Sequence, residues 1–136
     1  MILVDTTPLV ALCDARDGLH RAAREHLAKL LPKGLHVCEA VLVECCFHLP
    51  HAAQRQRLEA TLDELGIDSL PTDDAPFRSD VFAWLAKYAD QEPDWADGCI
   101  AVLCGRDKGL RVWTYDSEFR TTWRRPDGRR IPLAIA

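Results

Sequence analysis

The sequence predicts an α/β fold in which a central parallel sheet is flanked by helices. Short apolar runs at residues 1–5, 35–38, 110–114 and 131–135 are typical of strands, and longer segments with helical spacing separate them. Strands that alternate with helices in this way form a parallel sheet. The chain has 136 residues, 48% of them hydrophobic, and no repeat or long linker. We therefore expect a single domain over residues 1–136.

Local start and stop signals place the helices between these strands. After the first strand, Thr7 is a candidate N-cap and Pro8 a first helical position, which predicts a helix through about Asp14. Apolar residues at helical spacing predict the next helix over Leu19–Leu31, before Gly34. By the same reasoning, further helices are expected around Glu44, over 51–65, over about 76–89 and over 94–104.

Four carboxylates in otherwise apolar stretches are the strongest functional signal: Asp5, Glu44, Asp97 and Asp116. None has a neighbouring Lys or Arg, and burying an unpaired carboxylate is costly. Asp5 and Asp116 end strands, and ligands of such sheets bind beyond the carboxyl ends of the strands. We therefore expect the four acids to hold one or two Mg²⁺ or Mn²⁺ ions, which lower the pKa of a bound water and polarise a phosphoryl group.

Each acid also has an ordinary structural interpretation. Asp5 could cap the first helix, Asp97 could be a favourable acid in a first helical turn, and Asp116 could be a turn residue. Asp94 follows Pro93 and is three residues before Asp97, so it is either a second metal ligand or an N-cap. Both interpretations of Asp94 stay open at this point.

The charge of the chain limits its possible partners. The net charge is −4, whereas a nucleic-acid binder is usually basic, so global charge does not predict RNA binding. The one local basic cluster flanks a Pro-Asp-Gly turn and comprises Arg124, Arg125, Arg129 and Arg130. It is either a possible RNA contact or a solvated hairpin.

Cysteine usage and hydropathy predict a cytoplasmic protein. No apolar run approaches the roughly 20 residues of a membrane span, and Asp5 interrupts the apolar start before it could form a signal-peptide core. Six cysteines without a Cys-x-x-Cys pair are typical of buried thiols in a reducing compartment.

Four segments, in order, resemble the PIN-domain family, and within it the VapC-like toxin ribonucleases. ILVDTTPLVAL resembles the opening strand with its Asp-Thr/Ser motif, and VCEAVLVECCFHL resembles the glutamate-bearing segment. KYADQEPDWADGCIAVLC is similar to a Pro-x-Asp-x-x-Asp-Ala helix start, and VWTYDSEF to a Thr-x-Asp strand end followed by an aromatic residue. Gly98 departs from the family, which usually has Ala there, and this puts local rigidity in doubt.

The resemblance implies a PIN-like fold and a Mg²⁺- or Mn²⁺-dependent endoribonuclease that is the toxin of a type II toxin–antitoxin pair. It implies metal-binding roles for Asp5, Glu44, Asp97 and Asp116, with Asp94 close by. It also implies that the hydroxyls of Thr6 and Thr114 support the site by orienting a carboxylate or a water. It also implies an RNA substrate, a cognate antitoxin and a homodimer.

Two alternatives remain open. One is a catalytically silent PIN-like module whose acids receive an Arg or Lys from a partner. The other is an aspartyl-phosphate phosphatase with Asp5 as nucleophile, which normally needs a second acid where this chain has Thr7.

Overall fold

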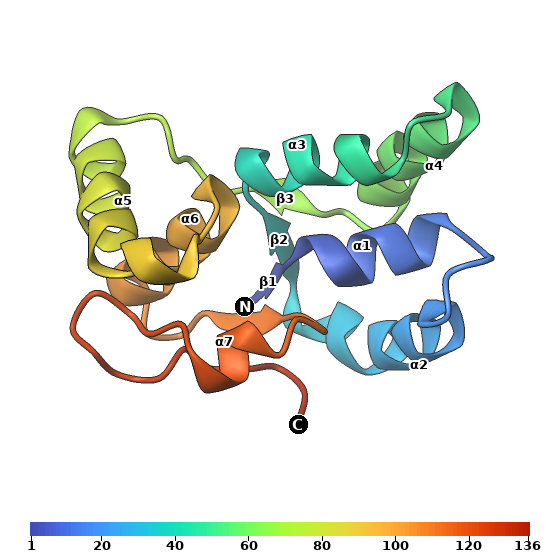
Figure 1. Cartoon of the computed structure of the whole chain (residues 1–136). Helices are drawn as coiled ribbons and strands as arrows, with labels where there is room; N and C mark the ends of the chain where they lie inside the picture. The colour runs from blue at the N-terminus through green and yellow to red at the C-terminus, as the bar shows by residue number, and fades with distance from the viewer.

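The computed structural model describes residues 1–136 and contains a four-stranded parallel sheet of order β3-β2-β1-β4. The strands are β1 (Ile2–Val4), β2 (Leu35–Val37), β3 (Asp68–Ser69) and β4 (Arg111–Trp113). Helices flank the sheet, so the predicted α/β fold with a central parallel sheet is confirmed (Figure 1).

The helices divide between the two faces of the sheet (Figure 1). On one side lie α1 (Thr6–Cys13), α2 (His20–Leu30), α3 (Glu39–His48) and α4 (Ala52–Glu64), and on the other α5 (Ala75–Lys87) and α6 (Trp95–Arg106). The 3₁₀ turns η1 (Leu31–Lys33) and η2 (Ala89–Gln91) and the short helix α7 (Glu118–Thr121) complete the chain. The chain moves outward from β1 to β3 and then returns to the far side of β1. Because crossovers between parallel strands are right-handed, this reversal places α5 and α6 on the opposite face.

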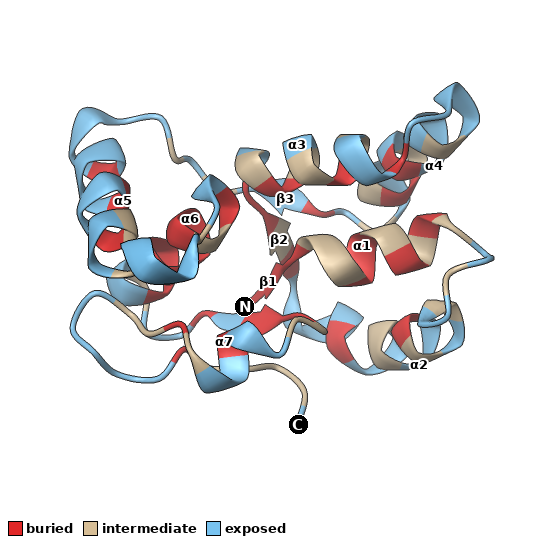
Figure 2. Cartoon of the chain, in the orientation of Figure 1, coloured by how far each residue is buried: buried red, intermediate tan, exposed pale blue.

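The hydrophobic core lies where the strands meet the inward sides of the helices, as the red segments of Figure 2 show. Ile2, Leu3 and Val4 are almost completely buried because both faces of β1 are covered. Helix α6 is buried on nearly every side from Gly98 to Cys104, which explains why its sequence is apolar throughout rather than amphipathic.

Gly98 lies at a close contact between α5 and α6. A β-carbon built at this position would come within 2.9 Å of Val81 Cγ1 and 3.3 Å of Trp84 Cε3. The departure from the family's usual Ala therefore has a packing reason, since the missing methyl group lets the two helices approach closely.

Three local predictions were wrong. Residues 131–135 do not form a strand: this segment runs beside β4 and makes a single parallel bridge, Val112 to Leu133, in part because Pro132 has no N–H to donate. The two-residue strand β3 was missed because Asp68 and Ser69 are polar and exposed. Thr7 is not the N-cap of α1, which begins at Thr6 and has Asp5 in the cap position.

None of the helices is long and apolar enough to cross a membrane. All six cysteines are free, and five are buried, as the sequence predicted for core thiols. Burial raises the pKa of the Cys38 thiol to about 11, so this thiol is protonated and unreactive at neutral pH.

Candidate active site

The carboxyl ends of β1 and β4 form the switch point of this sheet. These two strands are neighbours, yet their helical connections lie on opposite faces of the sheet. The chain leaves β1 toward α1 on one face, and it enters β4 from α6 on the other. A crevice opens at such a point in α/β sheets and is the usual ligand position. Asp5 directly follows β1 and Asp116 lies three residues after β4. The fold therefore brings these two acids, 111 positions apart in the sequence, to the same edge.

Asp5 is the most deeply buried acid of the chain, with 5% of its surface exposed. Its Oδ2 accepts a 2.7 Å hydrogen bond from the Thr114 hydroxyl, and its side chain does not cap α1. Burial raises its pKa from 3.8 to about 6, and the charges of Asp116 and Asp94 add to this rise, against hydrogen bonds from Thr114 and the Thr6 backbone. The capping interpretation of Asp5 is thus not realised, and no cationic side chain pairs with this buried carboxylate.

Asp94 and Asp97 form a reciprocal capping box at the start of α6. Asp94 Oδ1 accepts from the backbone N–H of Asp97 at 2.9 Å, and Asp97 Oδ2 accepts from the backbone N–H of Asp94 at 3.2 Å. Burial, followed by the charges of Asp94 and Asp5, raises the pKa of Asp97 to about 8. Asp94 is therefore a cap, and Asp97 caps it in return.

Thr114 and Thr7 hold the end of β4 against the start of α1. The Thr114 hydroxyl, which donates to Asp5, also accepts from the backbone N–H of Asp116 at 3.0 Å. Thr7 Oγ1 accepts from the backbone N–H of Tyr115 at 2.9 Å. Sequence reasoning assigned Thr7 to a helix cap and missed this role, because only the pairing of β1 with β4 brings the two segments together.

Glu44 occupies a different environment from Asp5. It is half-buried on α3, which packs against both α1 and α6, and its carboxylate makes no hydrogen bond or ion pair. The apolar residues around it in sequence do not enclose it, since Val43 and Phe47 are exposed. Its expected burial among apolar side chains was wrong, because α3 turns only Val41 and Cys45 fully inward.

The charge of the site fits a cation. The ion pairs of the chain join Arg106 to Asp74 and Asp80, and Arg129 to Asp127, so none involves a predicted site acid. In their present positions, no three acidic, histidine or cysteine side chains converge closely enough to hold one ion. One or two carboxylates with several waters is, however, the usual set for Mg²⁺, and hard oxygen donors suit it. Asp5, paired with no cation, therefore fits a Mg²⁺ or Mn²⁺ ligand.

The basic cluster lies at the far end of α6 from these acids. Arg124 and Arg130 form an antiparallel bridge around Gly128, which has a φ of 87°, and the Pro126 ring packs on Gly105 in the last turn of α6. Gly105 and Asp97 are eight residues apart on that helix, or about 12 Å along its axis. These arginines therefore lie on a hairpin that is separate from the acidic site.

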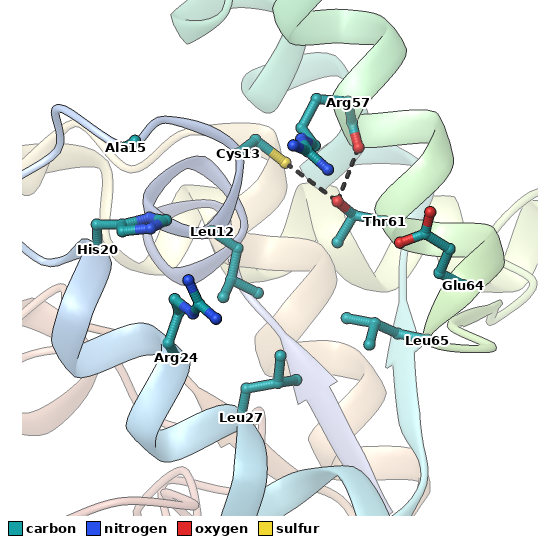
Figure 3. Close-up of a pocket in the computed structure, with 10 residues that line it drawn as sticks. All are labelled: Leu12, Cys13, Ala15, His20, Arg24, Leu27, Arg57, Thr61, Glu64 and Leu65. Carbon is teal, nitrogen blue, oxygen red and sulfur yellow. Dashed lines mark hydrogen bonds between the residues drawn. The ribbon is translucent and has the colours of Figure 1, made fainter.

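A hollow of about 530 Å³ lies between α1, α2 and α4 (Figure 3). Leu12, Leu27 and Leu65 form its apolar part, and the Cys13 thiol lies 3.9 Å from Thr61 Oγ1. No predicted site residue lines this hollow, so it is separate from the acids at the switch point.

Comparison with known proteins identifies the fold. A family model described as the PIN domain matches residues 2–123. Among solved structures, the fold is similar to that of VapC20 from Mycobacterium tuberculosis, described as a sarcin-ricin loop cleaving toxin. The TM-score is 0.71 at 21% sequence identity, over 88% of this chain and 93% of that one. A search of curated proteins finds no match.

Proposed function

Because this chain belongs to the PIN domain family, we propose that it is a metal-dependent endoribonuclease. The observation that carries the proposal is the burial of Asp5 at the switch point, beside the charges of Asp94 and Asp116 and without a cationic side chain to neutralise it. A buried, unpaired carboxylate is expensive unless a cation binds it. A divalent cation held by carboxylate oxygens can activate water and stabilise the charge that develops in phosphodiester hydrolysis.

We assign the ion-binding roles to Asp5, Asp97 and Asp116, with Glu44 and the second oxygen of Asp94 as further candidates. When bound, Mg²⁺ or Mn²⁺ supplies a water of lowered pKa and stabilises charge on the phosphoryl oxygens, and one or two ions can do so. Thr114 orients Asp5 through its hydroxyl bond, and the capping box fixes Asp97 at the start of α6. Thr6 contributes through its backbone bond to Asp5.

We propose an RNA substrate and a role as the toxin of a toxin–antitoxin pair, by analogy with the toxin VapC20, whose fold is similar. The cognate antitoxin would silence the acidic site, and two copies of the chain would form a homodimer. Exposed Val43 and Phe47 on α3 and Phe82 on α5 support a partner surface, since aromatic residues are enriched in interface cores. Six free cysteines support action in the cytoplasm.

The test is cleavage of a panel of structured RNAs by the purified protein with Mg²⁺, Mn²⁺ or EDTA. We expect Asp5→Asn and Asp97→Asn each to reduce cleavage by more than about a hundredfold, because each removes a proposed metal ligand. Asp63→Asn, at an exposed position on α4, is the matched control and should cleave normally. Cleavage that survives EDTA or Asp97→Asn would overturn the proposal. A protein that binds RNA or a partner but never cleaves would favour the silent module.

A further inference from the structure

A second hollow, of about 550 Å³ and open to solvent, is lined by residues of η2 and of the α7 segment. Its lining residues are Gln91, Glu118, Thr121 and Thr122, and none of them is apolar. A hollow built only from hydrogen-bonding side chains suits a polar ligand better than an apolar one.

The walls of this hollow continue directly from the segments that carry the acids. Gln91 lies three residues before Asp94, and Glu92, with a φ of 50°, turns the chain between them. On the other wall, the backbone N–H of Glu118 donates to Asp116 Oδ1 at 2.9 Å. A ligand whose reacting group lies at the acids would therefore extend naturally into the hollow.

Two of the four lining side chains, Gln91 and Glu118, are free to bind a ligand. The Gln91 amide and the Glu118 carboxylate make no hydrogen bond or ion pair within the chain, whereas the Thr121 hydroxyl already bonds to Ser117 O at 3.2 Å and Thr122 Oγ1 at 3.1 Å. No cation lines the hollow, and Glu118 is negative, so a phosphate would be repelled. A carboxylate and an amide oxygen instead accept N–H groups from the edge of a nucleobase.

We propose that this hollow binds one unpaired nucleobase of the RNA next to the cleaved phosphodiester, and that Glu118 and Gln91 select a base carrying an exocyclic amino group. Adenine, cytosine and guanine carry that donor, and uracil does not. Proteins read single-stranded RNA in this way, through hydrogen bonds to the edges of splayed bases. The inference rests on the proposed function, because it takes RNA as the ligand of the adjoining site.

The experiment measures binding separately from cleavage. Fluorescein-labelled r(A)₆, r(C)₆ and r(U)₆ are titrated with the Asp97→Asn protein and Mg²⁺, and fluorescence anisotropy gives each Kd. We expect r(A)₆ and r(C)₆ to bind about tenfold more tightly than r(U)₆, since one good paired contact discriminates by about that factor. Adding Glu118→Ala should reduce this ratio to nearly one, and Gln91→Ala should reduce it in part. Glu59→Ala, at an exposed position on α4, is the control and should leave the ratio unchanged.

Equal binding of the three oligonucleotides, or a preference that persists in the Glu118→Ala protein, would overturn the inference even if the wild type cleaves RNA. A base preference that depends on Glu118 would support it even if the wild type cleaves nothing, and in that case only the proposed nuclease activity would fail. Loss of a protein partner on Glu118→Ala, with base preference unchanged, would assign the hollow to that partner and overturn the RNA assignment.

Discussion

The Thr114 hydroxyl donates a 2.7 Å hydrogen bond to Asp5 Oδ2, joining residues 109 positions apart in the sequence. Both residues are buried, and the same hydroxyl accepts the backbone N–H of Asp116. One side chain thus links the end of β1, which carries Asp5, to the end of β4, which leads to Asp116. This bond lowers the pKa of Asp5, whereas burial raises it, so Thr114 favours the ionised form that a metal ion requires.

Thr114→Val keeps the shape of the side chain and removes this hydroxyl. We expect a loss of about 2 kcal/mol in the free energy of unfolding, because a charge-assisted bond disappears and the Asp116 N–H loses its partner. We also expect weaker binding of Mn²⁺ and at least about tenfold slower cleavage. Urea denaturation and metal titration measure the two effects. Thr72→Val, which removes a hydroxyl without a hydrogen bond, is the control, and equal behaviour of the two variants would contradict the prediction.

The pH dependence of stability should be opposite in sign to that of an ordinary paired acid. The pKa values of Asp5 and Asp97 rise from 3.8 to about 6 and about 8, so the native state holds protons that the unfolded state releases. Without metal, the free energy of unfolding should therefore fall as pH increases from about 4 to about 8. Thermal denaturation in EDTA from pH 5 to pH 9 measures this slope. Asp97→Asn should flatten its upper part, and a wild-type slope of the opposite sign would contradict the prediction.

Added Mg²⁺ should raise Tm more at pH 8 than at pH 5. At pH 8 both Asp5 and Asp97 give up protons readily to a bound cation, whereas at pH 5 the ion must compete with them. Differential scanning fluorimetry at the two pH values checks this, with Na⁺ at matched ionic strength as the control. A Tm shift independent of pH would show that neither acid binds the ion.

Gly98→Ala should destabilise the protein although Ala favours helices by about 1 kcal/mol. The new methyl group would lie 2.9 Å from Val81 Cγ1 in a fully packed contact, and overpacking costs about 1–3 kcal/mol. A double-mutant cycle with Val81→Ala should recover part of the loss. Gly18→Ala is the control, because a β-carbon there meets nothing within 4 Å. A more stable Gly98→Ala protein would contradict the close packing of α5 on α6.

The double variant Arg129→Ala and Arg130→Ala should weaken RNA binding without slowing the chemical step. Both side chains are exposed on the hairpin at the far end of α6 from the acids, so any contact would be with phosphates beyond the cleaved bond. We expect KM to rise and kcat to stay the same. The slope of log Kd against log salt concentration should also fall by up to about one unit for each lost phosphate contact. An unchanged Kd at every salt concentration would identify a solvated hairpin.

Most of the alternation of strands and helices, and the positions of the acids along the chain, could be predicted from the sequence alone. The strands around Leu3, Val37 and Val112 were predictable because short apolar runs bounded by turn and cap residues are typical of strands covered on both faces. A functional role for Asp5 was predictable because its carboxylate lies within one of these apolar runs. Family membership follows from the same ordered motifs, and the match over residues 2–123 confirms it.

Other features depend on contacts between distant segments and were decided only by the tertiary structure. The hydrogen bond from the Tyr115 backbone to Thr7 exists because folding brings β4 to β1. Likewise, a methyl group at Gly98 would clash with Val81 only because α5 packs against α6. The strand expected over 131–135 does not form, because a strand needs a continuous ladder of hydrogen bonds to a neighbouring strand. Pro132 has no backbone N–H to donate to such a ladder, and only the bridge between Val112 and Leu133 is made. Periodicity determines which side of an element is apolar. Which residues then meet across elements is determined by packing, and that includes the contact of Thr114 with both Asp5 and the backbone of Asp116.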